Sequence, residues 1–518
     1  MTPASLPGRA ARAPALTALL LSLALAGCVN LAPDYTRPAP AVPRADASTT
    51  NIATDPARPG TSALSASDAA QVLPDWRAVF LDERLRGTVE LALRENRDLR
   101  IAALQIEQAR AVFRQTDAQR LPALNASAGA SRSGTAGAVT QQVSLQLALS
   151  SYELDFFGRV RNLSDSAAQA LFSREESRRS TQISLVSETA AAWLTWAADL
   201  ERQRLAQETL ASRERSLALT RRRHELGAIS GLVLSQAETA VESARAETVV
   251  WPTTLAQDRH ALELLLGAAL PASLEPRAAD ASGTLSQLVE LPAGVPSSVL
   301  QRRPDVLAAE HALIASHADI GAARAARFPS ISLTASAGTG SRALSGLFDA
   351  GSGSWSFGPS VSLPIFDGGS RAAAVRQAEA SRDIALATYD KTIQTAFREV
   401  ADALAERATL ADRLAAQRAL LAATERQLRL AEAQYRVGST TQLDLLDAQR
   451  SLLSAQQSLI ALRLSELLNR VTLYKVLGGG WQDIATAVAA APTTAATTTA
   501  PNAATTVAPK AATNAATN

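Results

Sequence analysis

Cysteine and methionine are almost absent from this 518-residue chain, which contains one of each. A single cysteine, Cys28, excludes a framework of intramolecular disulfides and any metal cluster built on cysteines. Aromatic residues make up only 4% of the chain, whereas apolar residues make up 47%. This composition, rich in Ala, Leu, Gln, Arg and Glu, is typical of long packed helices and unlike that of an ordinary α/β enzyme.

A surplus of positive charge is also missing, because the formal net charge is only +2. The two extra arginines, Arg9 and Arg12, lie in the first 27 residues, and the other 49 basic side chains equal the 49 acidic ones in number. A nucleic-acid-binding protein needs a basic surface for phosphates, so we expect no nucleic-acid partner.

Catalytic signatures are missing as well. The sequence contains no nucleophile elbow and no Walker-type phosphate loop, so any energy source must lie in partner proteins. Its histidines do not have the spacing of metal ligands, and they are His224, His260, His311 and His317. We therefore expect no enzyme, no cofactor and no metal site.

After the N-terminal leader, no run of 18 or more strongly apolar residues occurs, so the sequence predicts no transmembrane helix. Any spanning structure would then be a β-barrel. The leader itself has a basic start and an apolar stretch at residues 15–26, followed by small residues and Cys28. This pattern resembles a bacterial lipobox and predicts a signal peptide at 1–27 with acylation of Cys28. The alternative is an ordinary secretory signal that happens to contain a cysteine.

Glycine and proline are spaced in a way that indicates an internal two-fold repeat. No glycine occurs between Gly158 and Gly227 or between Gly369 and Gly438, so each window is 68 residues long. Each half is interpreted as two strands, a long helix, a break and a second helix. A 68-residue helix would be about 100 Å long.

The long windows carry coiled-coil periodicity. In the first, apolar residues follow a spacing of three and four, and they are Ile183, Val186, Ala190, Trp193, Ala197 and Leu200. In the second, residues recur every seven positions at Leu414, Leu421, Leu428 and Tyr435. Helices alone are equally compatible with a coiled-coil scaffold. Pro252 is expected to kink or interrupt the helix that follows Gly227.

Short segments alternate between apolar and small polar residues with a period of two. One example alternates Trp355, Phe357, Val361, Leu363 and Ile365 with serine and glycine. Similar segments begin near Val143 and Ile331. The pattern suits a barrel strand with one face toward lipid and one toward water, although a soluble half-buried hairpin would show it too. Together with the predicted lipidation, we expect transmembrane strands.

Four strands cannot close a barrel around a lumen, and open sheet edges are not tolerated in lipid. The chain is therefore predicted to form an oligomer. Three copies would supply twelve strands, an even number in the known range; two or four copies would also close.

The chain resembles the TolC-like outer membrane factor family, in particular its NodT-type efflux lipoproteins. The matching motifs in chain order are Cys28 to Tyr35, Trp76 to Phe80, Asn96 to Leu99, Tyr152 to Arg159, Leu291-Pro292 with Arg302 to Asp305 and Ala308 to Glu310, Gly321 to Ser330, Tyr435 to Gly438, and Leu443 with Leu445 to Arg450. The resemblance implies a mainly α-helical homotrimer with a twelve-stranded barrel of four strands per chain and a periplasmic tunnel of long coiled helices.

The resemblance also implies a gate at the periplasmic end of the tunnel. Leu443 and Asp447 would face the axis near the constriction. Tyr435, Arg436 and Arg450 would hold helices together. A ring of three Asp447 carboxylates would favour cations. From the sequence alone, Asp447 could equally be a solvated acid near a helix start.

By the same resemblance, the protein is expected in the outer membrane as the exit duct for small toxic compounds, with a periplasmic adaptor and an inner-membrane RND-type transporter as partners. Metal-ion efflux, polypeptide secretion and a periplasmic coiled-coil adaptor are the alternatives. The predicted segments are a signal peptide at 1–27, a lipidated arm at 28–77, repeats at 78–290 and 291–483, and an Ala/Thr-rich tail at 484–518 that is expected to be disordered.

Overall fold

A computed structural model describes residues 29–39, 75–278 and 300–479. Cys28, the predicted signal peptide and the predicted tail lie outside the described residues, as does most of the predicted arm. Three short 3-10 turns lie between the main elements, at Ala118–Arg120, Ala272–Leu274 and Leu344–Gly346. The helices are α2 (Trp76–Val79), α3 (Glu83–Glu95), α4 (Arg97–Asp117), α5 (Arg159–Glu225), α6 (Gly231–Leu266), α8 (Pro304–Ala325), α9 (Ser370–Arg436) and α10 (Gln442–Val476), and the strands are β1 (Leu124–Thr135), β2 (Ala138–Glu153), β3 (Ser330–Ser341) and β4 (Gly353–Ser362).

Two helices of 67 residues each, α5 and α9, dominate the described chain. They occupy the two glycine-free windows of the sequence, as predicted. Glycines with positive φ flank both helices, Gly158 and Gly369 at their starts and Gly227 and Gly438 just beyond their ends. A left-handed residue stops helical hydrogen bonding at little cost only when it lacks a Cβ atom. These four glycines therefore set the helix lengths.

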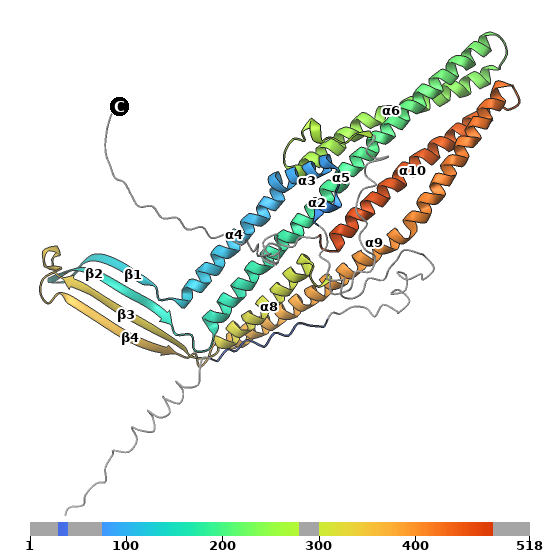
Figure 1. Ribbon diagram of the computed structural model, residues 1–518. Coiled ribbons are helices and arrows are strands. Elements are labelled where there is room, and N and C mark those ends of the chain that lie inside the picture. Colours follow the sequence, from blue (N-terminus) through green and yellow to red (C-terminus); the bar gives the residue numbers. More distant parts are fainter. Residues whose placement is uncertain (1–28, 40–74, 279–299, 480–518) are drawn as a thin grey trace, which may run out of the picture. The chain divides into compact units, whose positions relative to one another are not determined.

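Each long helix turns back into a shorter antiparallel partner, so that α5 packs on α6 and α9 packs on α10 (Figure 1). Helix α8 lies against both α5 and α9, and α4 lies along α5. Helix α6 continues through Pro252 without interruption, so the expected interruption is wrong, and the expected kink stays a prediction. Pro252 is exposed, and the carbonyl that loses its amide partner there can be hydrated instead.

The main apolar core forms where α5 meets α3, α6 and α10. The predicted coiled-coil positions in α5 are buried from Ile183 to Ala197. Trp193 at their centre is fully buried, and its indole Nε1 donates to the carbonyl of Leu274 at 3.0 Å. The periodicity in the sequence therefore identified the core face of α5 correctly.

The strands form one antiparallel sheet with the order β1-β2-β3-β4. Cross-strand partners share a face of such a sheet. One face carries apolar residues, for example Ala126 beside Leu147, Leu147 beside Ala337, and Ala337 beside Trp355. The other face is formed by serine, threonine, glutamine, asparagine, alanine and glycine. Strand β4 ends at Ser362, so Leu363 and Ile365, which were expected in this strand, lie beyond it.

The end of β4 has a simple cause, since Pro364 has no amide hydrogen to continue the pairing. A bulge between Leu149 and Tyr152 also interrupts the register of β2 with β3, and Ser151 takes a positive φ of 47° there. The single extra residue keeps Tyr152 on the apolar face, opposite Leu333.

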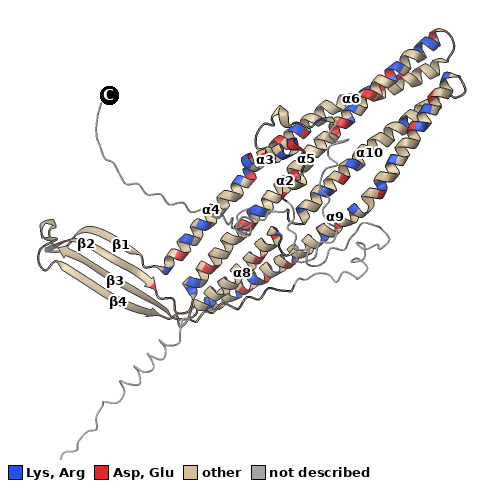
Figure 2. Cartoon of the chain, in the orientation of Figure 1, with Lys and Arg blue, Asp and Glu red and all other residues tan. Residues whose placement is uncertain are grey.

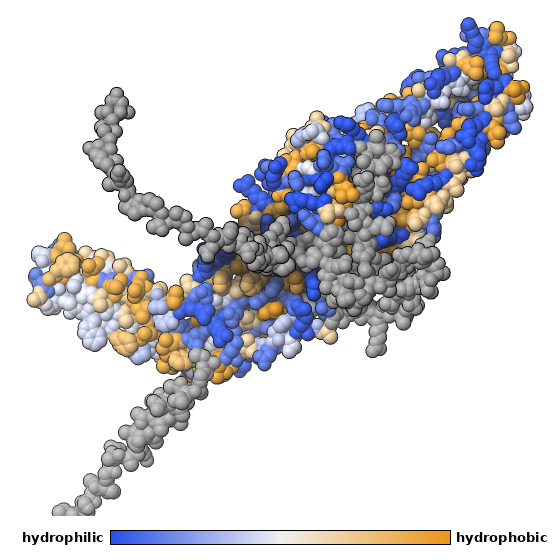
Figure 3. Space-filling view, in the orientation of Figure 1, coloured by the Kyte–Doolittle hydropathy of each residue, from blue (hydrophilic) through white to orange (hydrophobic). Residues whose placement is uncertain are grey.

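Charge is distributed very unevenly between helices and sheet. Basic and acidic residues mark the helices along their whole length, whereas the strands are almost free of them (Figure 2). Arg132 and Glu153 are the charged residues of the four strands. The space-filling view shows apolar residues over the sheet and mostly hydrophilic ones over the helices (Figure 3). Among the described helices, none is both long enough and apolar enough to cross a membrane.

Candidate gate at the turn between α9 and α10

The predicted gate residues lie on both sides of the turn that joins α9 to α10. Helix α9 ends at Arg436, the chain reverses through Gly438 with φ of 79°, and α10 begins at Gln442. A capping box fixes this start. The amide of Asp444 donates to Thr441 Oγ1 at 3.2 Å, and the amide of Thr441 donates to Asp444 Oδ2 at 3.0 Å. Two otherwise unpaired amides of the helix end are thereby satisfied.

Asp444 is held as a carboxylate by its neighbours. The hydroxyl of Thr441 donates to its Oδ2 at 2.6 Å, and the hydroxyl of Thr440 donates to the same atom at 2.8 Å. These hydrogen bonds, that of Thr441 first, lower the pKa of Asp444 below its ordinary value. The acid in the first turn of α10 is therefore Asp444.

Asp447 lies beyond the first turn of α10. Its Oδ1 is 3.0 Å from Nη2 of Arg450, one turn further along the helix, and both side chains are more than half exposed. The pair is thus a surface ion pair of the i,i+3 type, worth a few tenths of a kcal/mol to the helix. Its charges are accessible from solvent.

Tyr435 lies near the end of α9 and contacts the first helical hairpin. The guanidinium of Arg223, in the last turn of α5, lies 5.0 Å from the centre of the Tyr435 ring. The hydroxyl of Tyr435 is buried without a hydrogen-bond partner among the described residues. Arg436 bonds weakly within its own helix, to the carbonyl of Glu432 at 3.4 Å.

A groove of about 650 Å³ separates the two hairpins near this turn. Leu443, Leu446, Arg450 and Leu453 contribute from α10, and residues of α5 and α6, most of them polar, form the opposite wall. Glu247 of α6 accepts a hydrogen bond from the Gln457 amide of α10 at 2.6 Å. On α5, burial and then the nearby charge of Arg450 lower the pKa of Arg213, which also lines the groove.

The structure therefore brings some of the predicted residues together and leaves others apart. Asp447 pairs with Arg450, and Arg450 shares the groove with Leu443, whereas Asp447 is not among the residues that line the groove. Tyr435 contacts the first hairpin instead. Leu443 is half exposed. The axial position predicted for Leu443 and Asp447 involves other copies of the chain and stays a prediction.

Four further residues were not anticipated from the sequence, and they are Arg213, Arg223, Glu247 and Asp444. For Asp444 a signal existed, because a threonine followed three residues later by an acid is a capping-box pattern. The other three lie about 200 residues away in the chain, and their spacing gives no sign of the contact.

This arrangement of an amphipathic sheet with two long helical hairpins and charged hairpin ends is that of an outer membrane channel, and known proteins agree. The sequence profile described as "Outer membrane efflux protein" matches residues 88–268 and 295–479. The "Probable efflux pump outer membrane protein TtgC" of Pseudomonas putida is 46% identical over 483 residues, covering 90% of this chain and 97% of that protein. The "Cation efflux system protein CusC" of Escherichia coli is 40% identical over 465 residues, covering 89% and 98%.

Solved structures give the same result. The crystal structure of the open state of the MtrE outer membrane channel from Neisseria gonorrhoeae matches with a TM-score of 0.76 and 35% identity, covering 87% of this chain and 98% of that one. The chain belongs to the outer membrane efflux protein family, which places it in the outer membrane as the channel component of an efflux system.

Proposed function

We propose that three copies of this chain form a passive exit duct for small toxic compounds, with a twelve-stranded barrel in the outer membrane. The two-faced sheet carries this proposal. Its apolar face suits lipid and its hydroxyl-rich face suits a water-filled lumen. Strands β1 and β4 are the edges of the sheet, and lipid does not tolerate free edges. Pairing β4 of one copy with β1 of the next would satisfy both.

The helical hairpins would form the periplasmic part of the duct. A helix of 67 residues is about 100 Å long, far longer than a globular core requires. The matching lengths of α5 and α9, each followed by a helix of about half that length, support an internal duplication. Six hairpins from three copies could then enclose a tunnel.

The turn between α9 and α10 is proposed as the gate. Three copies would place three Asp447 carboxylates and three Arg450 side chains around one axis. A ring of carboxylates in a narrow passage favours cations. Leu443 would narrow the passage, and the contacts of Tyr435, Arg436 and Arg450 would hold the closed position.

The chain has no phosphate-binding loop for ATP in its sequence, so transport energy would come from partners. By family resemblance these are a periplasmic adaptor and an inner-membrane RND-type transporter. The anchor would be an acylated Cys28. Replacement of Cys28 by serine should abolish incorporation of labelled palmitate in growing cells. Labelled Cys28→Ser protein would refute the acylation and leave the duct proposal intact.

A second candidate cargo is a metal ion. The similarity to a protein named for cation efflux favours it, whereas the similarity to one named as a probable efflux pump is neutral on cargo. The two cargoes can be distinguished by expressing the protein in a bacterium that lacks its own outer membrane efflux channels. It is expressed once with a transporter and adaptor for organic compounds and once with a transporter and adaptor for metal ions. Restored resistance to organic solvents and dyes supports our proposal; restored resistance to toxic metal salts alone supports the metal candidate.

The duct itself can be tested on purified protein. In detergent the full chain should have the mass of three copies by light scattering, and in planar bilayers it should produce discrete conductance steps. A stable single chain without conductance would overturn the proposal. A trimer that shows no conductance would support the predicted assembly but contradict its proposed role as a duct.

A further inference from the structure

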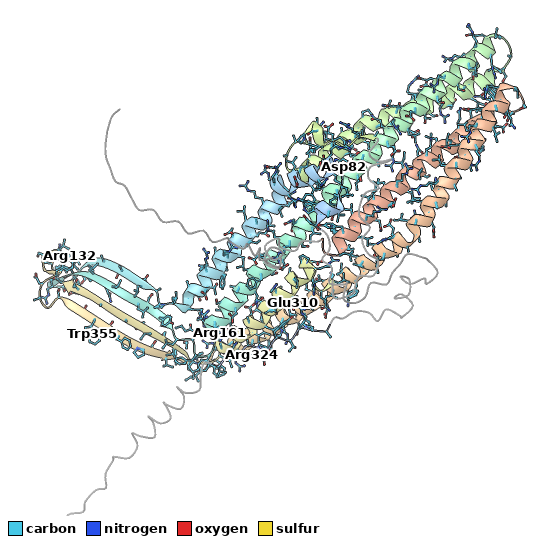
Figure 4. The ribbon with its side chains drawn as sticks, viewed as in Figure 1. Asp82, Arg132, Arg161, Glu310, Arg324 and Trp355 are labelled. Atoms are coloured by element: carbon cyan, nitrogen blue, oxygen red, sulfur yellow. The ribbon has the colours of Figure 1, made fainter. Side chains whose placement is uncertain are left out.

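The two charged residues of the sheet lie at opposite ends and differ in their partners. Glu153 ends β2 on the side of the helices, where Arg159 donates to its two oxygens at 2.9 and 2.5 Å. Arg132 lies toward the turn that joins β1 to β2 (Figure 4). It forms no ion pair with any described residue. The charge of Glu153 is therefore neutralised within the chain, whereas the charge of Arg132 is available to a partner outside the chain.

Arg132 is also on the apolar face of the sheet. It pairs with Gln141, and two residues along the same face Ala130 pairs with Val143. From Leu124, the first residue of β1, Arg132 is eight residues along the strand, or about 27 Å at the usual rise per residue. Barrel strands are tilted by about 35–45°, so this length raises Arg132 by about 20 Å within an apolar band that is about 25 Å tall. Arg132 therefore lies near the outer edge of this band.

A second arginine, Arg342, lies just beyond the end of β3, and by the alternation of the strand it continues the polar face rather than the face of Arg132. Arg342 follows Ser341, the residue of β3 that pairs with Val143. Two strand spacings, about 10 Å, separate β1 from β3. Arg342 is exposed and forms no ion pair with a described residue. The nearby acid of the β3–β4 connection, Asp349, pairs with neither arginine within the described residues.

We propose that Arg132 binds a phosphate group of lipid A in the outer leaflet of the membrane. This inference rests on the proposed function, because it requires the apolar face of the sheet to meet lipid. A charged side chain on that face costs free energy at the bilayer centre but almost none at the level of the headgroups. An anionic headgroup can form an ion pair with it there. A planar guanidinium binds phosphate through two parallel hydrogen bonds.

Lipid A fits this position better than a glycerophospholipid does. Its phosphates are monoesters, which carry more than one negative charge near neutral pH, and Arg132, which has no counter-ion among the described residues, complements that charge. The position across the membrane agrees as well. The turn between β1 and β2 lies at the end of the sheet that is remote from the helices. With the helices in the periplasm, this turn lies on the outer side of the membrane.

The test measures lipid binding by the purified full-length protein in detergent. Bis-phosphorylated lipid A, phosphate-free lipid A and phosphatidylglycerol are added in turn, and bound copies are counted by native mass spectrometry. Wild type should retain bis-phosphorylated lipid A and bind the other two weakly. Arg132→Gln should bind it about ten-fold less tightly, as expected when charge-assisted hydrogen bonds are lost. Arg132→Lys should lie between the two.

The control is Arg426→Gln, which removes an exposed arginine of α9 that forms no ion pair among the described residues. It should bind lipid A like wild type. Equal binding by wild type and Arg132→Gln would overturn the inference, and so would wild-type binding that does not depend on the phosphates. Preference for phosphatidylglycerol would show a diester site instead.

Conductance in phosphatidylcholine bilayers is measured in parallel. Conductance without lipid A binding rejects this inference alone, and absence of conductance rejects the proposed function.

Discussion

Arg37 binds Glu310 through two parallel hydrogen bonds, from Nε to Oε1 and from Nη2 to Oε2, each 2.6 Å long. Tyr35 donates to the same Oε1 at 2.9 Å. The Glu310 side chain is only 8% exposed, whereas that of Arg37 is 51% exposed. A segment of the arm near the predicted lipid anchor is therefore held on α8 by a buried carboxylate that depends on an exposed partner (Figure 4).

Replacement of Arg37 by alanine should lower the free energy of unfolding by about 2 kcal/mol, because Glu310 would keep its burial but lose its charged donor. Chemical denaturation of the detergent-solubilised protein measures the change. Arg245→Ala is the matched control, since Arg245 pairs with Glu214 and Glu242 at sites where all three side chains are about half exposed or more. It should change stability by less than about 0.5 kcal/mol. Equal effects of the two variants would contradict the role of the buried carboxylate.

The long helices could be predicted from the sequence because their boundaries depend on single residues. Gly158 and Gly227 take left-handed conformations that end helices, and the residues between them contain neither glycine nor proline. Pro252 shows where this local reasoning fails. A proline removes one hydrogen bond, but packing of α6 along α5 holds the helix together across it.

The gate could be predicted only in part, for a different reason. The pairing of Asp447 with Arg450 follows from their spacing on one helix. The groove does not, because its far wall comes from α5 and α6, including Arg213 and Glu247. Contacts between segments 200 residues apart depend on how the hairpins pack, and periodicity within each helix does not specify that.

Arg303 offers a test of the packing of α8 against the hairpin of α9 and α10. It is buried, and its guanidinium donates to Asp305 Oδ2 at 2.7 Å, to Glu399 Oε2 at 2.9 Å and to the carbonyl of Val476 at 2.9 Å. It thereby joins the start of α8 to α9 and to the end of α10. Arg303→Lys keeps the charge but cannot satisfy three acceptors in these directions.

We expect Arg303→Lys to lower the free energy of unfolding by about 1–3 kcal/mol, the usual cost of an unpaired buried polar group. The neighbouring Arg302 is exposed, so Arg302→Lys should leave stability unchanged. Denaturation curves of both variants, compared with wild type, give the answer. A loss of stability in both variants, or in neither, would contradict the role of Arg303 in joining α8 to α9 and α10.

Asp258 on α6 should make stability depend on pH. Burial, and then the neighbouring carboxylate of Asp199, raise its pKa from 3.8 to about 6. The charge of Arg202 offsets only part of this rise in the pKa of Asp258, because its guanidinium bonds to Asp199 at 2.5 Å. The folded protein thus holds a proton on Asp258 between about pH 4 and pH 6 that the unfolded chain has released. The contribution of Asp258 to stability therefore falls as the pH rises through this window and stays low above it.

Replacement of Asp258 by asparagine should accordingly stabilise the protein at pH 8 by about 1 kcal/mol, after allowance for solvent screening of a half-buried group. The gain should shrink at pH 6 and disappear near pH 4. Denaturation at these three pH values measures the difference from wild type. Asp319→Asn, at an exposed position of α8, should show no such trend. A gain of the same size at every pH would exclude the titration of Asp258 as its cause.

Removal of the Asp447 side chain should open the proposed gate. If three Asp447 carboxylates and their Arg450 partners surround one passage, Asp447→Ala widens it and breaks the ion pairs that hold neighbouring helix turns. Single-channel conductance in planar bilayers should rise, and preference for cations, measured as the reversal potential in a salt gradient, should fall. Arg450→Ala should raise conductance too, but it should leave the preference for cations intact or strengthen it, because the carboxylates remain.

Glu432→Gln provides the comparison that separates the ring from general surface charge. Glu432 is an exposed acid one turn before the end of α9, and its side chain has no ion pair among the described residues. It lies within a few residues of the same turn, so it shares the local potential but not the predicted axial position. If Glu432→Gln shifts the reversal potential as much as Asp447→Ala does, the effect belongs to the charge of the hairpin end as a whole. If Asp447→Ala alone shifts it, three carboxylates at one level of the passage are the simplest physical account, because field strength falls steeply with distance in a water-filled opening.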